Sequence, residues 1–391
     1  MGAPKDLRGK AAIVGVGLYG CGEAPGHTEV DMAVKAAQIA VADAGLTMAD
    51  IDGICTCSTA ASMFPMSVIE HLGIKPSFIE GTCIGGSSFV EHILPAMMAL
   101  EFGICNAVLV TYGSVQRTGE IDRAALAKAR ATTEPYNHEK IYSPIMPVSA
   151  YAMAARRHMH EFGTTREQMA EVAVAARKWA NLNPDAFRHG DLSVEDVLGA
   201  RPLASPFTVA DCCLVTDGAG AFVLTRADRA KDLKQKPVYV MGVGSACWNF
   251  RISEMPSLTT TCASQSGADA YAMSGMSAAD IQHVMLYDAF TINPILFLED
   301  LGFCKKGEGG AFVSGGRIEP GGALPLNTNG GGLSCVHPGM YGVFTVIESV
   351  QQIRGECGDR QVAGVDVSLA HGNGGTLSSQ CTAVLGSEAA L

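Results

Sequence analysis

The 391-residue sequence is poor in charged and in aromatic residues, which make up 17% and 6% of it. With 48% hydrophobic residues, a disordered chain and a coiled coil are both excluded. The 28 Lys and Arg residues fall short of the 39 Asp and Glu residues, so the net charge is −11. Without a surplus of cations for phosphate groups, we expect no nucleic-acid partner. The length predicts two or three domains, or one large core with an internal duplication.

The sequence also lacks a long apolar run. The longest stretch, from Ile93 towards Val110, is interrupted by Pro95, Glu101 and Asn106, whereas a membrane span needs roughly 20 apolar residues. The first six residues lack the apolar segment of a secretory signal. We therefore expect no membrane association and a cytoplasmic location.

Metal-ligand spacing is missing as well, although the sequence holds 13 cysteines. Cys55 and Cys57 are too close in sequence for a zinc knuckle, and the adjacent pair Cys212 and Cys213 is equally unsuitable. The odd number and the size of the chain argue against a disulfide framework. We predict no metal site and interpret most of the cysteines as small buried apolar residues.

An internal duplication organises the sequence. Four segments recur in the same order: 12–17 as 239–244, 45–52 as 275–282, 82–87 as 328–333, and 108–113 as 367–372. Short β-rich apolar runs at 11–16, 107–112, 238–243 and 365–370 predict buried strands. Helical stretches such as 31–44 lie between them, and this alternation predicts an α/β fold with mostly parallel sheets. We place the two halves at residues 1–230 and 231–391.

A segment from about 114 to 204 departs from this rhythm and carries much of the basic charge. We interpret it as an inserted cap over the opening of the first half. Its basic side chains could meet an anionic ligand such as a nucleotide phosphate, or form a solvated helix face. They are Arg156, Arg157, Arg177, Lys178 and Arg188.

Cys83 lies in a glycine-rich turn, 81–88, between an extended segment and a helical pattern that runs from Phe89 to Met98. Backbone amides at such a turn stabilise a thiolate, and glycines let the backbone approach a bound group. This geometry fits a structural cysteine and a nucleophile equally well.

The second half supplies three polar segments punctuated by glycine. They are 287–291 beginning with Tyr287, 327–339 containing Asn329 and His337, and 371–375 beginning with His371. Polar residues at strand ends before glycine turns are where α/β proteins gather catalytic groups. The duplication predicts that equivalent turns of the two halves meet at a common centre.

These motifs resemble those of the thiolase superfamily, most closely its sterol-carrier-protein-type branch, over essentially the whole chain. Cys83 matches the acylated nucleophile, and Tyr287-Asp-Ala-Phe matches a segment that reads Asn-Glu-Ala-Phe or His-Asp-x-Phe in the family. Asn329-Gly-Gly through His337-Pro matches Asn-x-x-Gly-Gly…Gly-His-Pro, and 371–375 matches Cys-x-Gly-Gly-Gly. The resemblance implies the thiolase fold, with duplicated βαβαβ halves in a five-layered α-β-α-β-α arrangement and an inserted cap or loop region.

The resemblance also implies a thiolase-type C-acyltransferase that cleaves or forms a carbon–carbon bond of a 3-oxoacyl-CoA. In this mechanism His337 accepts the Cys83 proton, Cys83 becomes the acyl-enzyme, and Asn329 and backbone amides near Gly374 and Gly375 bind oxyanions. Coenzyme A and its thioesters are substrates, and no tightly bound cofactor is implied.

Two positions depart from the family pattern. His371 replaces the second cysteine, which handles the α-carbon proton; an imidazole can transfer that proton at neutral pH. Tyr287 replaces an Asn or His, and a phenol can donate to an enolate or act in aldol cleavage. The alternatives are therefore a thiolase-fold aldolase, a C-acetyltransferase acting on a carbon nucleophile, and a non-catalytic acyl- or lipid-binding subunit.

The family implies partners too. Its members are usually homodimers, and several work with a small zinc-ribbon/OB-fold protein. The benzoylsuccinyl-CoA thiolases, whose substrates are aromatic, are one such group.

Overall fold

Nine strands form one sheet in the computed structural model, which describes residues 7–119 and 138–391. The strands are β1 (Ala11–Gly22), β2 (Gly53–Cys55), β3 (Phe78–Glu80), β4 (Ala107–Val115), β7 (Asp217–Arg226), β8 (Val238–Cys247), β9 (His283–Leu286), β10 (Val367–Gly374) and β11 (Ser379–Gly386). Their order across the sheet is β3-β2-β4-β7-β1-β8-β11-β10-β9. Each of the four runs predicted as strands contains a strand that continues past the predicted carboxyl end, although β10 begins at Val367 and not at 365.

The duplication is visible in this order. The series β2-β4-β7-β1 is mirrored by β9-β10-β11-β8, and the two series meet where β1 and β8 pair antiparallel. That junction has only two paired positions, Ala12 with Tyr239 and Ile13 with Val238. Because the pairing is so short, the two halves of the sheet separate and face each other.

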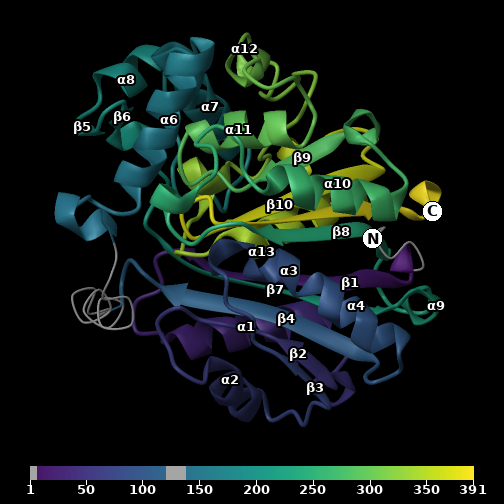
Figure 1. The fold of residues 1–391 in the computed structure, drawn as a ribbon. Helices are drawn as coiled ribbons and strands as arrows, with labels where there is room; N and C mark the ends of the chain where they lie inside the picture. The colour runs from purple at the N-terminus through teal and green to yellow at the C-terminus, as the bar shows by residue number, and fades with distance from the viewer. Residues whose placement is uncertain (1–6, 120–137) are drawn as a thin grey trace.

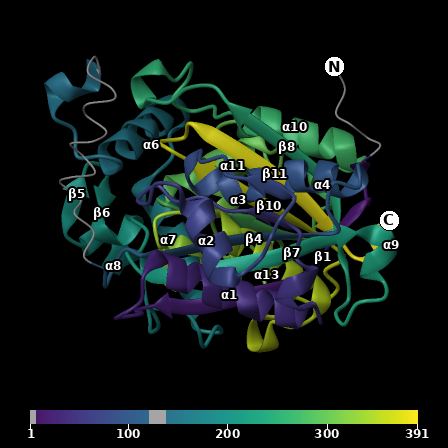
Figure 2. The ribbon, with the colours of Figure 1, turned by 90° about the horizontal axis from the view of Figure 1, so that it is seen from below.

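The helices complete a five-layered arrangement, as Figure 1 shows. They are α1 (Glu29–Asp43), α2 (Phe64–Leu72), α3 (Ser88–Glu91), α4 (Ile93–Glu101), α9 (Ala227–Ala230), α10 (Ala263–Ser274), α11 (Ile292–Asp300), α12 (Gly309–Val313) and α13 (Gly342–Arg354). Helices α3 and α13 lie between the two halves of the sheet, and each contacts strands of both halves. Helices α1 and α2 cover the outer face of the first half, seen from below in Figure 2, while α10 and α11 cover the second. The predicted layers are confirmed.

The prediction of mostly parallel sheets is wrong. Three strand pairs of the large sheet are parallel (β2 with β3, β2 with β4, β9 with β10) and five are antiparallel. The reason is the last strand of each half: β7 returns along β4, and β11 returns along β10 after a short turn. Only strands joined by a helical crossover run parallel.

Paired glycines explain the first repeat. A Cβ atom on Gly15 or Gly17 would overlap backbone atoms of α1, and one on Gly242 or Gly244 would overlap backbone atoms of α10. The two Gly-x-Gly segments therefore let one helix in each half lie directly on its strand.

The inserted segment packs against the second half of the chain. Its described part includes α6 (Val148–Phe162), α7 (Arg166–Ala180), α8 (Val194–Gly199) and β5 (Pro202–Ala204), which pairs with β6 (Phe207–Thr208) just beyond the segment. Helices α6 and α7 contact α11, and α7 also contacts α12, as the upper part of Figure 1 shows. The buried side chain of His158 in α6 forms a hydrogen bond with Glu299 of α11, with 3.0 Å between Nε2 and Oε1. The predicted cap over the first half is therefore wrong for these residues, and 120–137 lie outside the described residues.

No helix in the described ranges combines the length and the apolar character that crossing a bilayer requires.

Candidate active site

Cys83 lies in an exposed turn between β3 and α3. The turn is fixed by Ser88, whose Oγ accepts a hydrogen bond from Ile84 N (2.9 Å) and donates to Gly85 O (2.7 Å). Gly85 has a φ of +84°, which other residues rarely adopt. The single helix predicted after this turn is two helices, α3 and α4, that meet at His92. Pro95 explains the break, because it has no N–H to donate to the carbonyl of Glu91.

The turn at 374–375 lies against the Cys83 turn. A Cβ built on Gly85 would lie 2.7 Å from Gly375 N and 2.8 Å from Gly374 Cα, and one on Gly374 would overlap Ile84 O. The structure therefore brings these two predicted site regions together. Contact this close requires glycine at both positions.

Tyr287 joins the Cys83 turn to His337. Its ring lies so close to Gly86 that a Cβ there would overlap it. The same ring meets the His337 imidazole edge to face, with centroids 5.5 Å apart. The Tyr287 hydroxyl donates to Gly339 O at 3.2 Å. Burial holds its pKa well above the ordinary value, so the phenol is neutral.

His337 is a buried, neutral imidazole. Its backbone N donates to Thr216 Oγ1 at 2.9 Å, while its side-chain Nε2 is buried with no hydrogen-bond partner among the described residues. Burial lowers the pKa of His337 to about 4, so the imidazole is neutral at pH 7. A neutral imidazole with an unused nitrogen can take a proton from a bound group or a neighbouring thiol.

Asn329 holds the segment that carries His337. Its side-chain Oδ1 accepts from Gly331 N (2.8 Å) and from the Tyr341 hydroxyl (2.9 Å). Residues Gly331–Cys335 form one turn of π-helix, a rare conformation that occurs frequently at functional sites. Asn329 therefore shapes this segment through its own contacts.

His371 is not brought together with the other predicted residues. It is fully buried, its Nδ1 is 2.9 Å from Thr382 Oγ1 and its Nε2 is 2.9 Å from Gln380 Oε1. Its ring packs on Phe297 of α11, whereas the next residue, Gly372, faces the Cys83 turn. Successive residues of a strand point to opposite faces, so position 371 faces away from Cys83. With both nitrogens engaged and its pKa lowered to about 3 by burial, His371 is not placed for the proton-transfer role that the sequence predicted.

Comparisons with known proteins identify the family. Residues 244–387 match the family model described as "Thiolase C-terminal domain-like". The chain is 34% identical to the 17-hydroxy-3-oxo-4-pregnene-20-carboxyl-CoA lyase of Mycobacterium tuberculosis, over 92% of this chain and 95% of the relative. It is also 34% identical to an acetyl-CoA acetyltransferase of Methanothermobacter thermautotrophicus, over 93% and 96% of the two chains.

The chain belongs to the thiolase superfamily.

Similarity to sterol carrier protein 2 of Bos taurus, 27% identical over 94% of this chain and 70% of the relative, supports the sterol-carrier-protein-type branch. The benzoylsuccinyl-CoA thiolase subunit BbsB of Thauera aromatica is 36% identical over 62% of this chain and 66% of its own. Among solved structures, the "Ltp2-ChsH2(DUF35) aldolase" superposes with a TM-score of 0.87 at 32% identity, over 98% of this chain and 99% of the other.

A cavity of about 340 Å³ lies beside the His337 segment of this thiolase-superfamily chain. Its lining includes Arg117, Arg177, Arg188, Phe187, Leu214 and Ser334. Arg177 Nε donates to Ser334 Oγ at 3.1 Å, and Leu214 N donates to Gly332 O at 2.9 Å. Burial, and secondly the charge of Arg188, lower the pKa of Arg177. Guanidinium groups that repel one another at a half-buried site favour an anionic ligand.

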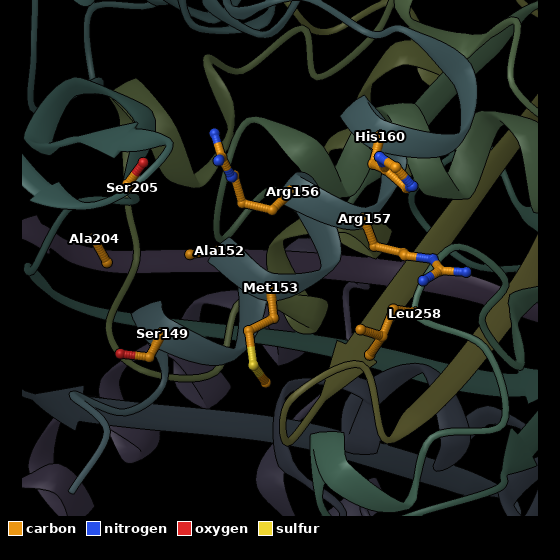
Figure 3. Close-up of a pocket in the computed structure, with 9 residues that line it drawn as sticks. All are labelled: Ser149, Ala152, Met153, Arg156, Arg157, His160, Ala204, Ser205 and Leu258. Carbon is orange, nitrogen blue, oxygen red and sulfur yellow. The ribbon is translucent and has the colours of Figure 1, made fainter. Parts of the chain in front are cut away.

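The other basic residues of the insertion lie apart from this cavity. A second hollow, of about 540 Å³, follows the outer face of α6 and contains Arg156, Arg157 and His160 (Figure 3). None of the predicted catalytic residues lines it. Lys178 forms a surface ion pair with Glu319 at 2.6 Å. The predicted basic cap thus divides between two hollows and a solvated helix face.

Two residues of the site carried no predicted role. Asp288 accepts hydrogen bonds from Gly332 N (2.6 Å) and Leu333 N (3.4 Å), and burial raises its pKa to about 7. Tyr341 lies edge to face with Tyr287 at 5.6 Å. Asp288 directly follows Tyr287, so its place in that motif was the available signal. In the described ranges, no group of three or more His, Cys, Asp or Glu is arranged to hold a metal ion.

Proposed function

We propose that this enzyme cleaves or forms a carbon–carbon bond of a 3-oxoacyl-CoA through an acyl-enzyme on Cys83. The observation that carries the proposal is the convergence of three turns: Gly85 lies against Gly374 and Gly375, and Tyr287 spans from Gly86 to His337. Relatives named as acetyl-CoA acetyltransferase and as benzoylsuccinyl-CoA thiolase support it.

In the cleavage direction, His337 Nε2 takes the Cys83 proton and the thiolate attacks the 3-oxo carbon. The carbon–carbon bond breaks, and its electron pair leaves as the enolate of the acyl-CoA that keeps the original thioester. The His337 imidazolium then gives its proton to the α-carbon of that enolate. Coenzyme A releases the acyl group from Cys83 and regenerates the thiol. The backbone amides of Cys83 and Gly375 are the proposed oxyanion donors, and loss of such a donor costs about 10²–10³ in rate.

The arginine-lined cavity is the proposed site for the phosphates of coenzyme A. Its wall is hydrogen-bonded to the segment that carries His337, through Leu214 N and Gly332 O. An anion held there would lie beside Leu333 and Ser334 of that segment.

The test is an intact-mass measurement after incubation with acetyl-CoA. We expect an increase equal to one acetyl group in the wild type, none in Cys83→Ala, and a much slower increase in His337→Ala. A wild-type protein that never gains the acetyl mass would overturn the acyl-enzyme.

Tyr287 favours a second candidate, aldol cleavage of a 3-hydroxyacyl-CoA. It replaces the family's Asn or His with a neutral phenol beside His337, and the lyase relative and the aldolase structure are both 32–34% identical to this chain. If Cys83→Ala keeps carbon–carbon cleavage while Tyr287→Phe loses it, the aldolase is the correct assignment. The C-acetyltransferase alternative requires the acetyl adduct on Cys83 and a second substrate whose carbon atom accepts the acetyl group.

A second copy of the chain is the proposed partner along β3. This strand is at an edge of the sheet, and Ile79 in it is 55% exposed. Exposed Ile104 lies beside it, because Ser77 Oγ donates to Ile104 O at 2.8 Å. Edge strands with apolar side chains favour pairing with another chain. Equilibrium sedimentation should show a dimer that Ile79→Lys weakens.

A small zinc-ribbon/OB-fold protein is a further proposed partner. The words "DUF35" and "subunit" in the names of two similar proteins support it. A cytoplasmic location also stays a prediction.

A further inference from the structure

A second thiol lies beside Cys83. Strands β2 and β3 are parallel neighbours, and Thr56 N donates to Glu80 O (3.1 Å), which continues their pairing past the strand ends. The residues that follow the two strands therefore leave the sheet side by side. Cys57 follows β2 and Cys83 follows β3, and their two side chains are hydrogen-bonded to each other.

The two thiols have different environments. Cys57 is 3% exposed, whereas Cys83 is exposed and its Sγ lies 3.9 Å from the carbonyl oxygen of Ser58. The Cys57 side chain also hydrogen-bonds to Ser88, whose Oγ fixes the Cys83 turn through Ile84 and Gly85. One hydroxyl thus holds both the turn and the second thiol.

Electrostatics decides which thiol ionises. The hydrogen bond with Cys83, burial, and the charge of Cys83 together raise the pKa of Cys57 far above its ordinary value. Ionisation of the pair therefore occurs at the exposed Cys83, and Cys57 keeps its proton. A thiol that keeps its proton beside a thiolate can donate a charge-assisted hydrogen bond.

Other titratable groups surround the pair: Glu29, Cys55, Glu80, His92 and Tyr112. Burial lowers the pKa of His92 to about 4, and burial raises that of Tyr112, so both are neutral near pH 7. Glu80 accepts from Gly81 N (2.8 Å) and Thr82 N (2.7 Å), just before Cys83.

We propose that Cys57 is a second thiol of the reaction centre, whose S–H donates a hydrogen bond to the Cys83 thiolate. This inference rests on the proposed nucleophilic role of Cys83. The Cys83 proton goes to His337, and the Cys57 proton stays on its own sulfur. When the Cys83 sulfur bonds to the acyl carbon, its charge moves onto the substrate oxygen and the hydrogen bond weakens; when the acyl group leaves, the bond forms again.

The second thiol of the site thus follows strand β2 and does not lie on β10. The sequence resemblance places the family's second cysteine at position 371, where this chain has a buried histidine that faces α11. Cys57 comes from the first half of the chain, directly beside the nucleophile.

The experiment measures alkylation of Cys83 by iodoacetamide from pH 6 to 10, followed on the Cys83 peptide by mass spectrometry. We expect Cys57→Ala to raise the apparent pKa of Cys83 by about one unit, which slows alkylation at pH 7 about tenfold. Cys57→Ser keeps a hydroxyl donor and should shift it by less. Cys105→Ala is the matched control, because Cys105 is a buried thiol beside Gly53 at the other end of β2.

An unchanged pH profile in Cys57→Ala, with the protein folded by circular dichroism, overturns the proposal. Equal shifts in Cys57→Ala and Cys105→Ala would also overturn it, since a general loss of packing would then be the cause. Alkylation needs no acyl-CoA, so this outcome is separate from the acetyl-adduct test. If Cys57→Ala shifts the pH profile of alkylation but the wild type forms no acetyl adduct, the proposed function is wrong. If the wild type forms the adduct but Cys57→Ala shifts nothing, only the role of Cys57 is wrong.

Discussion

Gly86→Ala tests the contact between the Cys83 turn and Tyr287. A Cβ atom at position 86 would overlap the Tyr287 ring, and carbon atoms in contact lie about 3.5–4.0 Å apart, so the ring must move by about 1 Å or more. That movement pulls the ring from His337 and the hydroxyl from Gly339 O. We expect a loss of about 1–3 kcal/mol in the free energy of unfolding and about 10²-fold in kcat.

The assays are urea unfolding and steady-state thiolysis of acetoacetyl-CoA. Gly199→Ala is the control, because a Cβ there meets no atom within 4 Å. In Gly86→Ala combined with Tyr287→Ala the space is open, so the stability cost of the Gly86 change should largely disappear. If Gly86→Ala keeps wild-type kcat and stability, the ring does not lie on this turn and the convergence of the site is refuted.

Four more predictions follow from the buried groups of the site and from the arginine cavity. His371→Ala should cost about 2–4 kcal/mol in unfolding free energy, because it leaves a cavity and unpaired polar atoms, yet Cys83 should still be acetylated; loss of the adduct in a folded variant would contradict this. The pKa of Asp288 is raised to about 7 by folding, so its contribution to stability is most favourable below pH 4 and falls as the pH rises from about 4 to 7. In urea titrations, the unfolding free energy of the wild type should therefore fall over that pH range relative to that of Asp288→Asn. The same pH dependence in both proteins would exclude the effect. With the pKa of His337 near 4, the acid limb of kcat/KM should lie well below pH 6, and a limb at pH 6.5 would contradict burial of this imidazole. Arg177→Gln should raise KM for acetyl-CoA about tenfold but leave a phosphate-free acetyl thioester unaffected, while Lys178→Gln changes neither.

Much of the fold follows from local sequence. The buried strands and the Gly-x-Gly segments are visible because they depend on neighbours in the chain. The meeting of Gly374 with the Cys83 turn was implied by the family resemblance. Pro95 could have predicted the break between α3 and α4. The antiparallel pairing could not be predicted, because it depends on where the chain goes after β4 and β10.

The same distinction between local and long-range features applies to the site residues. Cys83 and Tyr287 follow strands β3 and β9, and His337 follows the π-helical turn Gly331–Cys335; all three lie in motifs that are visible in the sequence. The orientation of His371 depends on strand register: a shift of one residue would turn it towards Cys83. The contact between Cys57 and Cys83 depends on the spacing of two strands, and no sequence interval encodes it.

The central helices have a consequence for how the protein folds. Helix α3 belongs to the first repeat but also packs on β10 and β11, and α13 belongs to the second repeat but also packs on β1 and β7. Part of the core of each repeat is therefore covered only when the other repeat is present. A chain cut within residues 231–237 should yield two fragments that are insoluble or unstructured alone and that regain activity when refolded together. The two repeats are then separate in sequence but a single unit in folding.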